Sequence, residues 1–203
     1  MKKALLMAAL AAAVVGGALG GGEQAVSTFT DKRDGKVYKI VEINGQTWFA
    51  ENLNYAAEGS KCYEDKAGNC EKYGRLYDWN TAMKACPAGW HLATDAEWTA
   101  LVNYAGGELT AGTKLKSSTG WMRHRGIPTG TNDYGFSALP GGDYDDYFND
   151  DYFGGSWWSA TEVDADYAWG RHMLYNHELA FEDDDDKTVL FSVRCMADKE
   201  AQK

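Results

Sequence analysis

Apolar and polar side chains alternate over residues 37–43, which is the first regular pattern in the chain. A second short run of the same kind, 46–49, follows directly after Asn44 and Gly45. An Asn-Gly pair between two such runs is a strong hairpin signal, because both turn residues must accept positive φ. The pattern predicts an antiparallel hairpin whose second strand places Trp48 in the core.

Two helices are predicted downstream of this hairpin. Residues 77–85 form a short helix, which the sequence Cys-Pro-Ala-Gly at 86–89 ends. Thr94 and Glu97 match a capping box, in which each side chain can bond the backbone N–H of the other residue. A second helix follows this box and ends at Gly106-Gly107. Its buried face holds four apolar residues at helical spacing: Trp98, Leu101, Val102 and Ala105.

Beyond Gly120 the chain is rich in glycine, aspartate and aromatic residues, and the helical period is lost. The long stretch 117–155 is expected to have little regular structure, and long ordered loops in a compact domain are often functional. Short antiparallel strands are predicted at 157–160, 167–174 and 189–195. In the last of these one face carries Val189, Phe191, Val193 and Cys195. The predicted fold class is α+β: a hairpin, two helices, a loop-rich region and a closing sheet.

Residues 1–20 have the three parts of a cleavable signal peptide. Lys2 and Lys3 form a basic start, 4–15 is an unbroken apolar run, and Ala18-Leu19-Gly20 offers small residues to signal peptidase. The apolar run is too short for a membrane span, which needs about 20 residues. We therefore expect a secreted, periplasmic or cell-surface protein with no transmembrane span in the mature chain. The expected organisation continues with a flexible leader at 21–30, one domain at 31–197 and a tail at 198–203.

Acidic side chains outnumber basic ones by 30 to 20, which gives the chain a formal net charge of −10. Removing Lys2 and Lys3 with the signal peptide changes this value to −12. Such a field repels phosphate backbones, so we expect no nucleic-acid partner. An aromatic content of 13% with only three prolines is typical of a packed domain rather than a disordered one.

Export exposes the four cysteines to an oxidising compartment, where four cysteines most often form two disulfides. Three pairings are possible. We favour Cys62–Cys70, which closes a small loop over a turn-forming stretch, and Cys86–Cys195, which joins the middle of the chain to its end. In the chain-entropy model a loop of about 100 residues contributes about 4.7 kcal/mol, and a loop under ten residues roughly half of that. The long bridge is therefore expected to matter more for stability.

A series of short motifs, in one order along the chain, resembles one known family. They include Gly-Gln-Thr-Trp-Phe-Ala-Glu-Asn-Leu at 45–53 and Ser-Val-Arg-Cys at 192–195. The others lie at 34–38, 73–79, 86–92, 94–98, 134–136, 138–142 and 157–161. Together they resemble the Fibrobacter succinogenes major paralogous domain over nearly all of the mature chain, residues 30–196. The function of that family is not established.

This resemblance implies a distant similarity to the C-type-lectin-like fold and to the formylglycine-generating, sulfatase-modifying group. Cys86 and Cys195 would then tie the closing strand of the fold to its helical half. The triplets of calcium-dependent lectins (Glu-Pro-Asn, Gln-Pro-Asp, Trp-Asn-Asp) do not occur in this chain. Cys195 also stands alone where the formylglycine-generating enzyme has a pair of redox-active cysteines. We therefore carry over no catalytic residue, and His91, in the Trp-His-Leu motif, is expected to be a structural hydrogen-bonding residue.

The most unusual segment is 143–153, in which aspartates alternate with aromatic residues. Clustered carboxylates can hold calcium, but the EF-hand pattern is absent, so we assign no metal and no cofactor. A second acidic run, Asp183 to Asp186, is predicted to be a charged turn. Exposed aromatic rings can stack on sugar rings, and the candidates in the irregular stretch are Trp121, Tyr144, Tyr147, Tyr152 and Phe153.

The expected function is a non-catalytic binding or adhesion module, for glycans or plant-fibre surfaces. Its partner would be a polysaccharide or a surface protein. Two alternatives remain open. One is a structural protein of the cell envelope, and the other is an envelope enzyme with a fold like that of the formylglycine-generating enzyme.

Overall fold

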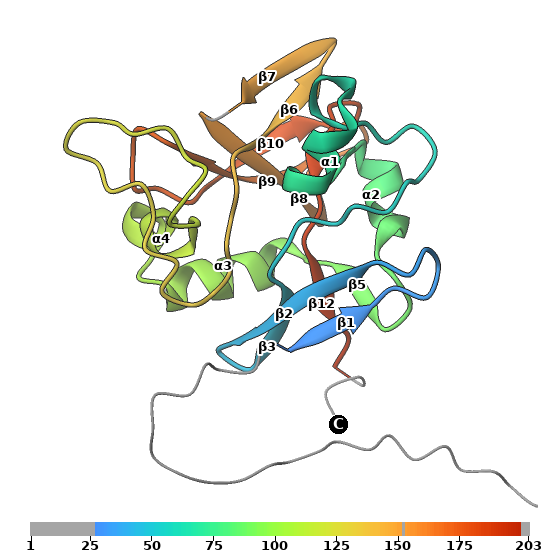
Figure 1. The fold of residues 1–203 in the computed structure, drawn as a ribbon, viewed down its shortest axis with the longest axis horizontal. Coiled ribbons are helices and arrows are strands. Elements are labelled where there is room, and N and C mark those ends of the chain that lie inside the picture. Colours follow the sequence, from blue (N-terminus) through green and yellow to red (C-terminus); the bar gives the residue numbers. More distant parts are fainter. Residues whose placement is uncertain (1–26, 152, 200–203) are drawn as a thin grey trace, which may run out of the picture.

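Two β-sheets form the centre of the structure, a computed structural model that describes residues 27–151 and 153–199 (Figure 1). The first sheet has the order β1-β2-β3-β12-β5, which are Thr28–Thr30, Val37–Ile43, Gln46–Phe49, Cys195–Ala197 and Trp90–Leu92. The second has the order β10-β9-β8-β11-β4, which are Phe181–Asp186, Tyr167–Leu174, Gly154–Glu162, Phe191–Ser192 and Leu76–Tyr77. A hairpin of β6 (Gly141–Asp145) and β7 (Tyr147–Asp151) joins the second sheet beside β8.

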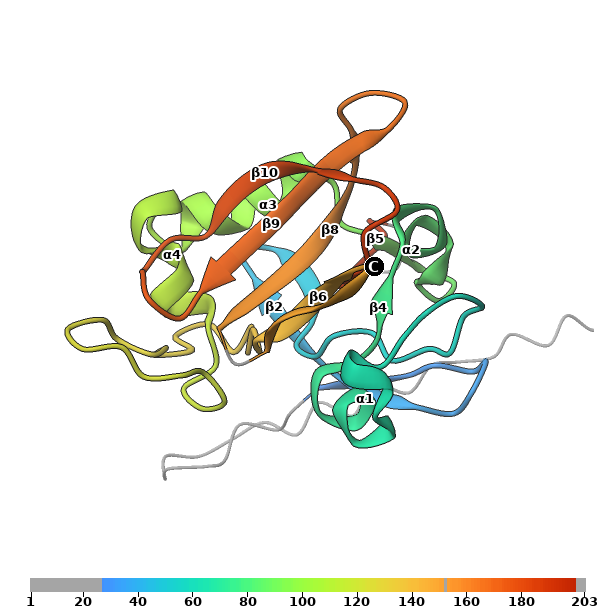
Figure 2. The ribbon, with the colours of Figure 1, turned by 90° about the horizontal axis from the view of Figure 1, so that it is seen from above.

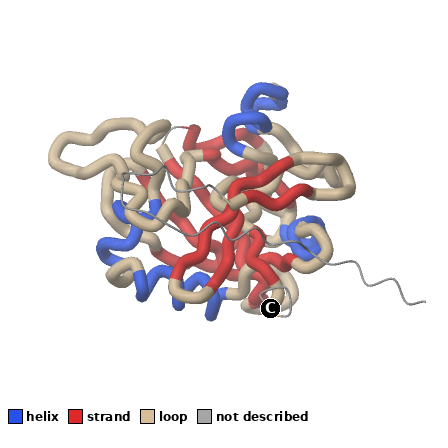
Figure 3. Tube along the Cα trace, turned by 60° about the horizontal axis from the view of Figure 1, so that its bottom comes forward, coloured by secondary structure: helices blue, strands red, loops and turns tan. Residues whose placement is uncertain are grey.

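The helices lie around these sheets, as Figure 3 shows. They are a 3-10 turn at Tyr63–Asp65, α1 at Ala67–Tyr73, α2 at Trp79–Ala85, α3 at Asp95–Tyr104 and α4 at Glu108–Leu115. Helices α3 and α4 cover one face of the second sheet, and the other face is seen in Figure 2. The predicted α+β class is confirmed in this mixed, sheet-rich architecture.

The predicted hairpin and the predicted capping box are both present. Asn44 and Gly45 have φ of 51° and 71°, which is the backbone conformation that their turn requires. Thr94 accepts from the backbone N–H of Glu97, and Glu97 bonds the backbone N–H of Thr94 in return. Local sequence signals were sufficient here because turn and cap geometry depend on a few adjacent residues.

Three other expectations shift or fail. The helix predicted at 77–85 begins at Trp79, because Asp78 caps it by accepting from Thr81 N and Tyr77 pairs in β4 instead. The stretch 117–155, expected to lack regular structure, contains the β6–β7 hairpin. The acidic run expected to be a turn, Asp183 to Asp186, is the end of edge strand β10, which pairs with β9 throughout. Edge strands tolerate such charges because one side of each faces water.

The strand predicted at 189–195 is divided between the two sheets. Phe191–Ser192 pairs with β4 and β8 in the second sheet, whereas Cys195–Ala197 pairs with β3 and β5 in the first. The chain therefore crosses from one sheet to the other at 193–194. The prediction that these side chains share one face is confirmed, because one core cluster contains Phe191, Val193 and Cys195, and Val189 packs against it.

The cysteines are paired as Cys62–Cys70 and Cys86–Cys195, the pairs that the sequence favoured. The long bridge joins the end of α2 to β12. A large aromatic core lies nearby, with Trp48 and Trp98 fully buried at 5.1 Å between ring centroids.

The signal peptide expected at 1–20 lies outside the described residues. Thr28–Thr30, expected at the end of a flexible leader, form β1 and pair with β2. Within the described parts of the chain, no helix has both the length and the apolar character needed to cross a membrane.

Candidate binding cleft

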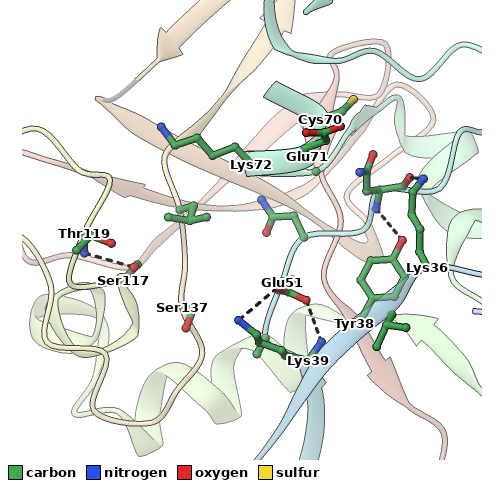
Figure 4. A pocket seen from close by; sticks show the side chains of 16 residues that line it. Lys36, Tyr38, Lys39, Glu51, Cys70, Glu71, Lys72, Ser117, Thr119 and Ser137 are labelled. Atoms are coloured by element: carbon green, nitrogen blue, oxygen red, sulfur yellow. Dashed lines mark hydrogen bonds and ion pairs between the residues drawn. The ribbon is translucent and has the colours of Figure 1, made fainter. Parts of the chain in front are cut away.

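A cleft of about 520 Å³ opens between the first sheet, α1 and the loop that precedes β6 (Figure 4). Five segments that are distant in sequence supply its lining. These are 36–39 from β2 and its approach, 50–54 after β3, 70–74 from α1, and the loop positions 117–119 and 137–139. Most of the lining side chains are polar, and they include three lysines and two glutamates. We refer to this feature as the cleft.

Asn52 lines the cleft with only 7% of its surface exposed, so it forms part of the cleft floor, and it uses both ends of its amide. Its Nδ2 donates to Tyr73 O at 2.8 Å and to Ser192 Oγ at 3.2 Å. Its Oδ1 accepts from Trp157 Nε1 at 2.9 Å and from Arg194 Nε at 2.6 Å. One side chain therefore fixes α1, β8 and the crossing segment relative to each other. A buried network in which every group is satisfied gives a site a defined geometry.

Arg194 lies beneath this floor and is 0% exposed. Besides Asn52, its guanidinium donates to three backbone carbonyls, those of Phe49 at 3.0 Å, Phe136 at 2.6 Å and Ser137 at 3.0 Å. Burial lowers the pKa of Arg194 to about 9, so the group is still charged at neutral pH. All four acceptors are neutral, and the cation is satisfied by dipoles rather than by an anion.

The cleft rim carries charges of both signs. Lys39 and Glu51 face each other at 3.8 Å, and Glu51 also accepts from the backbone N–H of Lys39 at 2.9 Å. Lys36 donates to Asn54 O and lies 3.2 Å from the carboxylate of Asp34. Figure 4 shows Lys72 extending from α1 towards the loop that carries Ser117 and Thr119.

The α1 wall is held against the floor in two ways. Cys70, a lining residue, is bonded to Cys62. Gly74, which ends α1, has φ of 78°, and a Cβ there would lie 2.7 Å from Cβ of Asn52 and 2.8 Å from Leu53 O. Glycine is required because both the conformation and the space exclude a side chain.

The opposite wall depends on a second buried cation, Lys116, which is 0% exposed. Its Nζ donates to Leu174 O at 3.0 Å and His177 O at 2.9 Å. Burial lowers the pKa of Lys116 to about 8. The next residue, Ser117, lines the cleft and donates its backbone N–H to Ala138 O at 2.8 Å.

The sequence model of the Fibrobacter succinogenes major domain matches residues 41–196. The chain belongs to this family. None of the curated proteins and none of the solved structures compared with the chain matches it. The family that the motifs resembled is thus confirmed, and its match spans four of the five cleft segments completely.

Two residues that build the cleft of this Fibrobacter succinogenes major domain, Asn52 and Arg194, were not predicted as site residues from the sequence. Asn52 and Arg194 lie inside the motifs at 45–53 and 192–195, so the signal was present in the sequence. They are 142 residues apart, and nothing in either motif alone indicates that they meet.

A second hollow, of about 320 Å³, lies on the outer face of the second sheet. Arg171 reaches Asp95 of α3 at 2.6 Å, so its neighbour His172 points to the face away from α3 (Figure 2). His172 lies 3.0 Å from Ser156 Oγ and 3.0 Å from Asp185 Oδ2. The lining also includes three further aspartates, Asp143, Asp145 and Asp183. We refer to this feature as the acidic hollow.

The five aromatic candidates do not form one surface. Trp121 is only 7% exposed, packs in the core and donates Nε1 to Ala138 O at 2.9 Å, so little of its ring faces solvent. Tyr144 is half-buried against Phe148. Tyr147 and Phe153 are 69% and 40% exposed, the latter edge-on to Tyr175. Tyr152 lies outside the described residues.

The acidic segment shows no arrangement of metal ligands where it is described. Over residues 27–151 and 153–199, no group of three or more His, Cys, Asp or Glu side chains is placed to hold a metal ion. Asn149 donates instead to Asp143 Oδ1 at 3.0 Å, across the β6–β7 hairpin.

His91, expected to be structural, bonds two carboxylates. Its Nδ1 lies 2.7 Å from Asp198 Oδ1 and its Nε2 3.2 Å from Glu97 Oε2. The hydrogen bond with Glu97 raises the pKa of His91. Although burial opposes the effect, bonds from His91 and Thr94 lower the pKa of Glu97 to about 2. His91 thus links the cap of α3 to the end of the described chain.

Proposed function

We propose that this protein is an exported, non-catalytic module that binds polysaccharide in the cleft. The observation that carries the proposal is the fixed polar lining of the cleft, which has a volume of about 520 Å³. Small-ligand sites generally have volumes of about 300–1,000 Å³ and a few polar groups in fixed positions. A short stretch of a sugar chain is of this size.

The chemistry of the lining also suits a sugar. Sugar hydroxyls both donate and accept hydrogen bonds. The cleft offers donors from lysine and amide groups, acceptors from carboxylates, and hydroxyls from Ser117, Thr119 and Ser137. Tyr38 is buried in the cleft wall with its hydroxyl accepting from Asn54 N at 3.1 Å, so recognition would rest on polar contacts more than on stacking.

Export and the distant lectin-like relation are part of the same proposal. The signal-peptide pattern at 1–20 supports export. The Cys86–Cys195 bridge, which ties β12 to the end of α2, supports a fold related to the C-type lectins. Terminal sequencing of the mature protein tests export. A start at Gly21 is expected, and an intact Met1 in the recovered protein would contradict it.

A retention assay on insoluble polysaccharides tests the binding function. Wild-type protein is mixed with cellulose, xylan, cross-linked pectin and mucin beads, beside Thr119→Trp and Ser118→Trp. Both positions are exposed, but only Thr119 lines the cleft. We expect at least one polymer to retain wild type and Ser118→Trp, and Thr119→Trp to be retained much less because the indole fills the cleft.

Each of the other possible results of this assay would contradict one part of the proposal. No retention of wild type on any polymer would contradict the glycan proposal, and crosslinking in intact cells would then test a structural role in the envelope. Equal retention of both variants would show that the polymer binds outside the cleft. Release of soluble reducing sugar during the assay would contradict a non-catalytic role.

A further inference from the structure

We infer that the cleft selects polysaccharides that carry carboxylates, such as polymers of uronic acids. This inference rests on the proposed function and names the class of ligand. It is drawn from the charges at the floor and rim of the cleft.

The floor carries a positive charge that no carboxylate neutralises by contact. Arg194 is fully buried, and its hydrogen-bond acceptors are an amide and three backbone carbonyls. Glu51, at the cleft rim, acts on the guanidinium through its charge and not through a hydrogen bond to it. Two of its acceptors, on Asn52 and Ser137, belong to residues that line the cleft. Because protein interior screens charge less than water does, its field extends into the cleft.

The rim adds to this field. Three lysines and two glutamates line the cleft, so its own side chains sum to a positive charge even though the chain carries −10. Lys36 and Lys39 are each placed near a carboxylate. Lys72, exposed in the last turn of α1, donates to the Tyr73 hydroxyl at 2.6 Å and extends from α1 in Figure 4.

The negative charges that dominate the chain are concentrated elsewhere. Four aspartates line the acidic hollow, on β6 and β10. The net charge of the protein opposes any polyanion at long range. A ligand with one carboxylate and free hydroxyls on each sugar ring suits a small positive cleft better than a dense polyphosphate does. This combination describes a uronic-acid polymer.

The test compares one polymer in two states of charge. Polygalacturonate and its fully methyl-esterified form share a backbone and differ in carboxylate charge. Binding of the full mature chain to each is measured by affinity electrophoresis in calcium-free buffer, with Lys72→Gln and Lys84→Gln. Lys72 and Lys84 are both exposed, in the last turns of α1 and α2, and only Lys72 lines the cleft.

We expect wild type and Lys84→Gln to bind the charged polymer more tightly than the ester. Lys72→Gln should lose about fivefold in affinity for the charged polymer, the upper range for an exposed ion pair. Equal binding of both polymers, abolished by Thr119→Trp, would overturn this inference while the proposed function stands. Equal losses in the two lysine variants would show a general charge effect and would also overturn it. Retention on neutral polymers alone would also overturn the inference about carboxylates. No binding to any polymer would overturn both this inference and the proposed function.

Discussion

The cleft and the acidic hollow both contain charged side chains, but the chain holds them in different ways. At the cleft, buried polar groups from β8, α1 and the crossing segment 193–194 meet at Asn52. At the acidic hollow, the aspartates stand on β6 and on edge strand β10, which are separated in the sheet by β8 and β9, and they are positioned mainly by backbone pairing. Burying a charge is costly unless it is fully hydrogen-bonded.

This difference suggests which of the two features is a built site. Exposed carboxylates on edge strands oppose aggregation and aid solubility without any ligand. A buried guanidinium with four acceptors instead holds the segments around the cleft in one arrangement.

Removing the long disulfide is expected to have the largest effect. Cys86 and Cys195 are 109 residues apart, and Cys195 directly follows Arg194. The variant Cys86→Ala/Cys195→Ala should lose about 4 kcal/mol of unfolding free energy in urea, because the unfolded chain gains freedom. Cys62→Ala/Cys70→Ala, with a separation of 8, should lose roughly half as much. A larger loss from the short bridge would refute this order.

The next prediction compares two asparagines. Asn52→Ala should lower the unfolding free energy by about 3 kcal/mol, because Arg194 Nε and Trp157 Nε1 lose their acceptor in the core. Asn149→Ala, at the acidic hollow, removes one partly exposed bond to Asp143 and should cost under about 1 kcal/mol. Similar losses in chemical denaturation would remove the distinction between the two regions.

The buried lysine behind the far wall gives a pH-dependent prediction. The pKa of Lys116 is about 8 in the folded protein, below its usual value of 10.5. Between these pH values the unfolded chain holds a proton that the folded protein has released, so stability should rise as pH increases. The gain should approach about 3 kcal/mol, which is what the fall in pKa from 10.5 to about 8 implies. Lys116→Met should flatten the curve of unfolding free energy against pH over this range, and an unchanged curve would show that Lys116 is not the titrating group.

The smallest effect is expected in the acidic hollow. Asp183 is exposed on β10, beside Glu182 and Asp184. Asp183→Asn should change the unfolding free energy by less than about 0.5 kcal/mol, with a slight gain from relieved like-charge repulsion. Retention on polysaccharide should be unchanged. A large fall in either thermal stability or retention would make the acidic hollow the better candidate site.

The sequence revealed those parts of the fold that depend on adjacent residues. The hairpin at Asn44-Gly45 and the cap at Thr94 rely on backbone conformations that a few side chains specify. The β6–β7 hairpin was missed because aspartate has low strand propensity, and its pairing is favoured by contacts with the rest of the sheet. The broken closing strand was missed for a related reason, since its alternating pattern continues while its partners change sheet.

The site was much less predictable than the fold. The aromatic candidates were chosen by composition, and Trp121 proved to be a core residue, because its ring fits between α4 and the loop before β6. The residues that build the cleft are ordinary lysines, asparagines and serines. Their importance comes from contacts between segments far apart in sequence, such as Asn52 with Arg194, and one sequence cannot show such contacts.

Hydrogen–deuterium exchange with oligogalacturonate tests most directly whether the cleft is the binding site. The mature protein is labelled with and without the oligosaccharide, and exchange is followed by mass spectrometry. We predict slower exchange in peptides that cover 36–39, 50–54 and 117–119, with no change over the described part of the hairpin, 141–151, or over β10. Slower exchange in the β6–β7 hairpin and β10, with none in the cleft segments, would contradict the account.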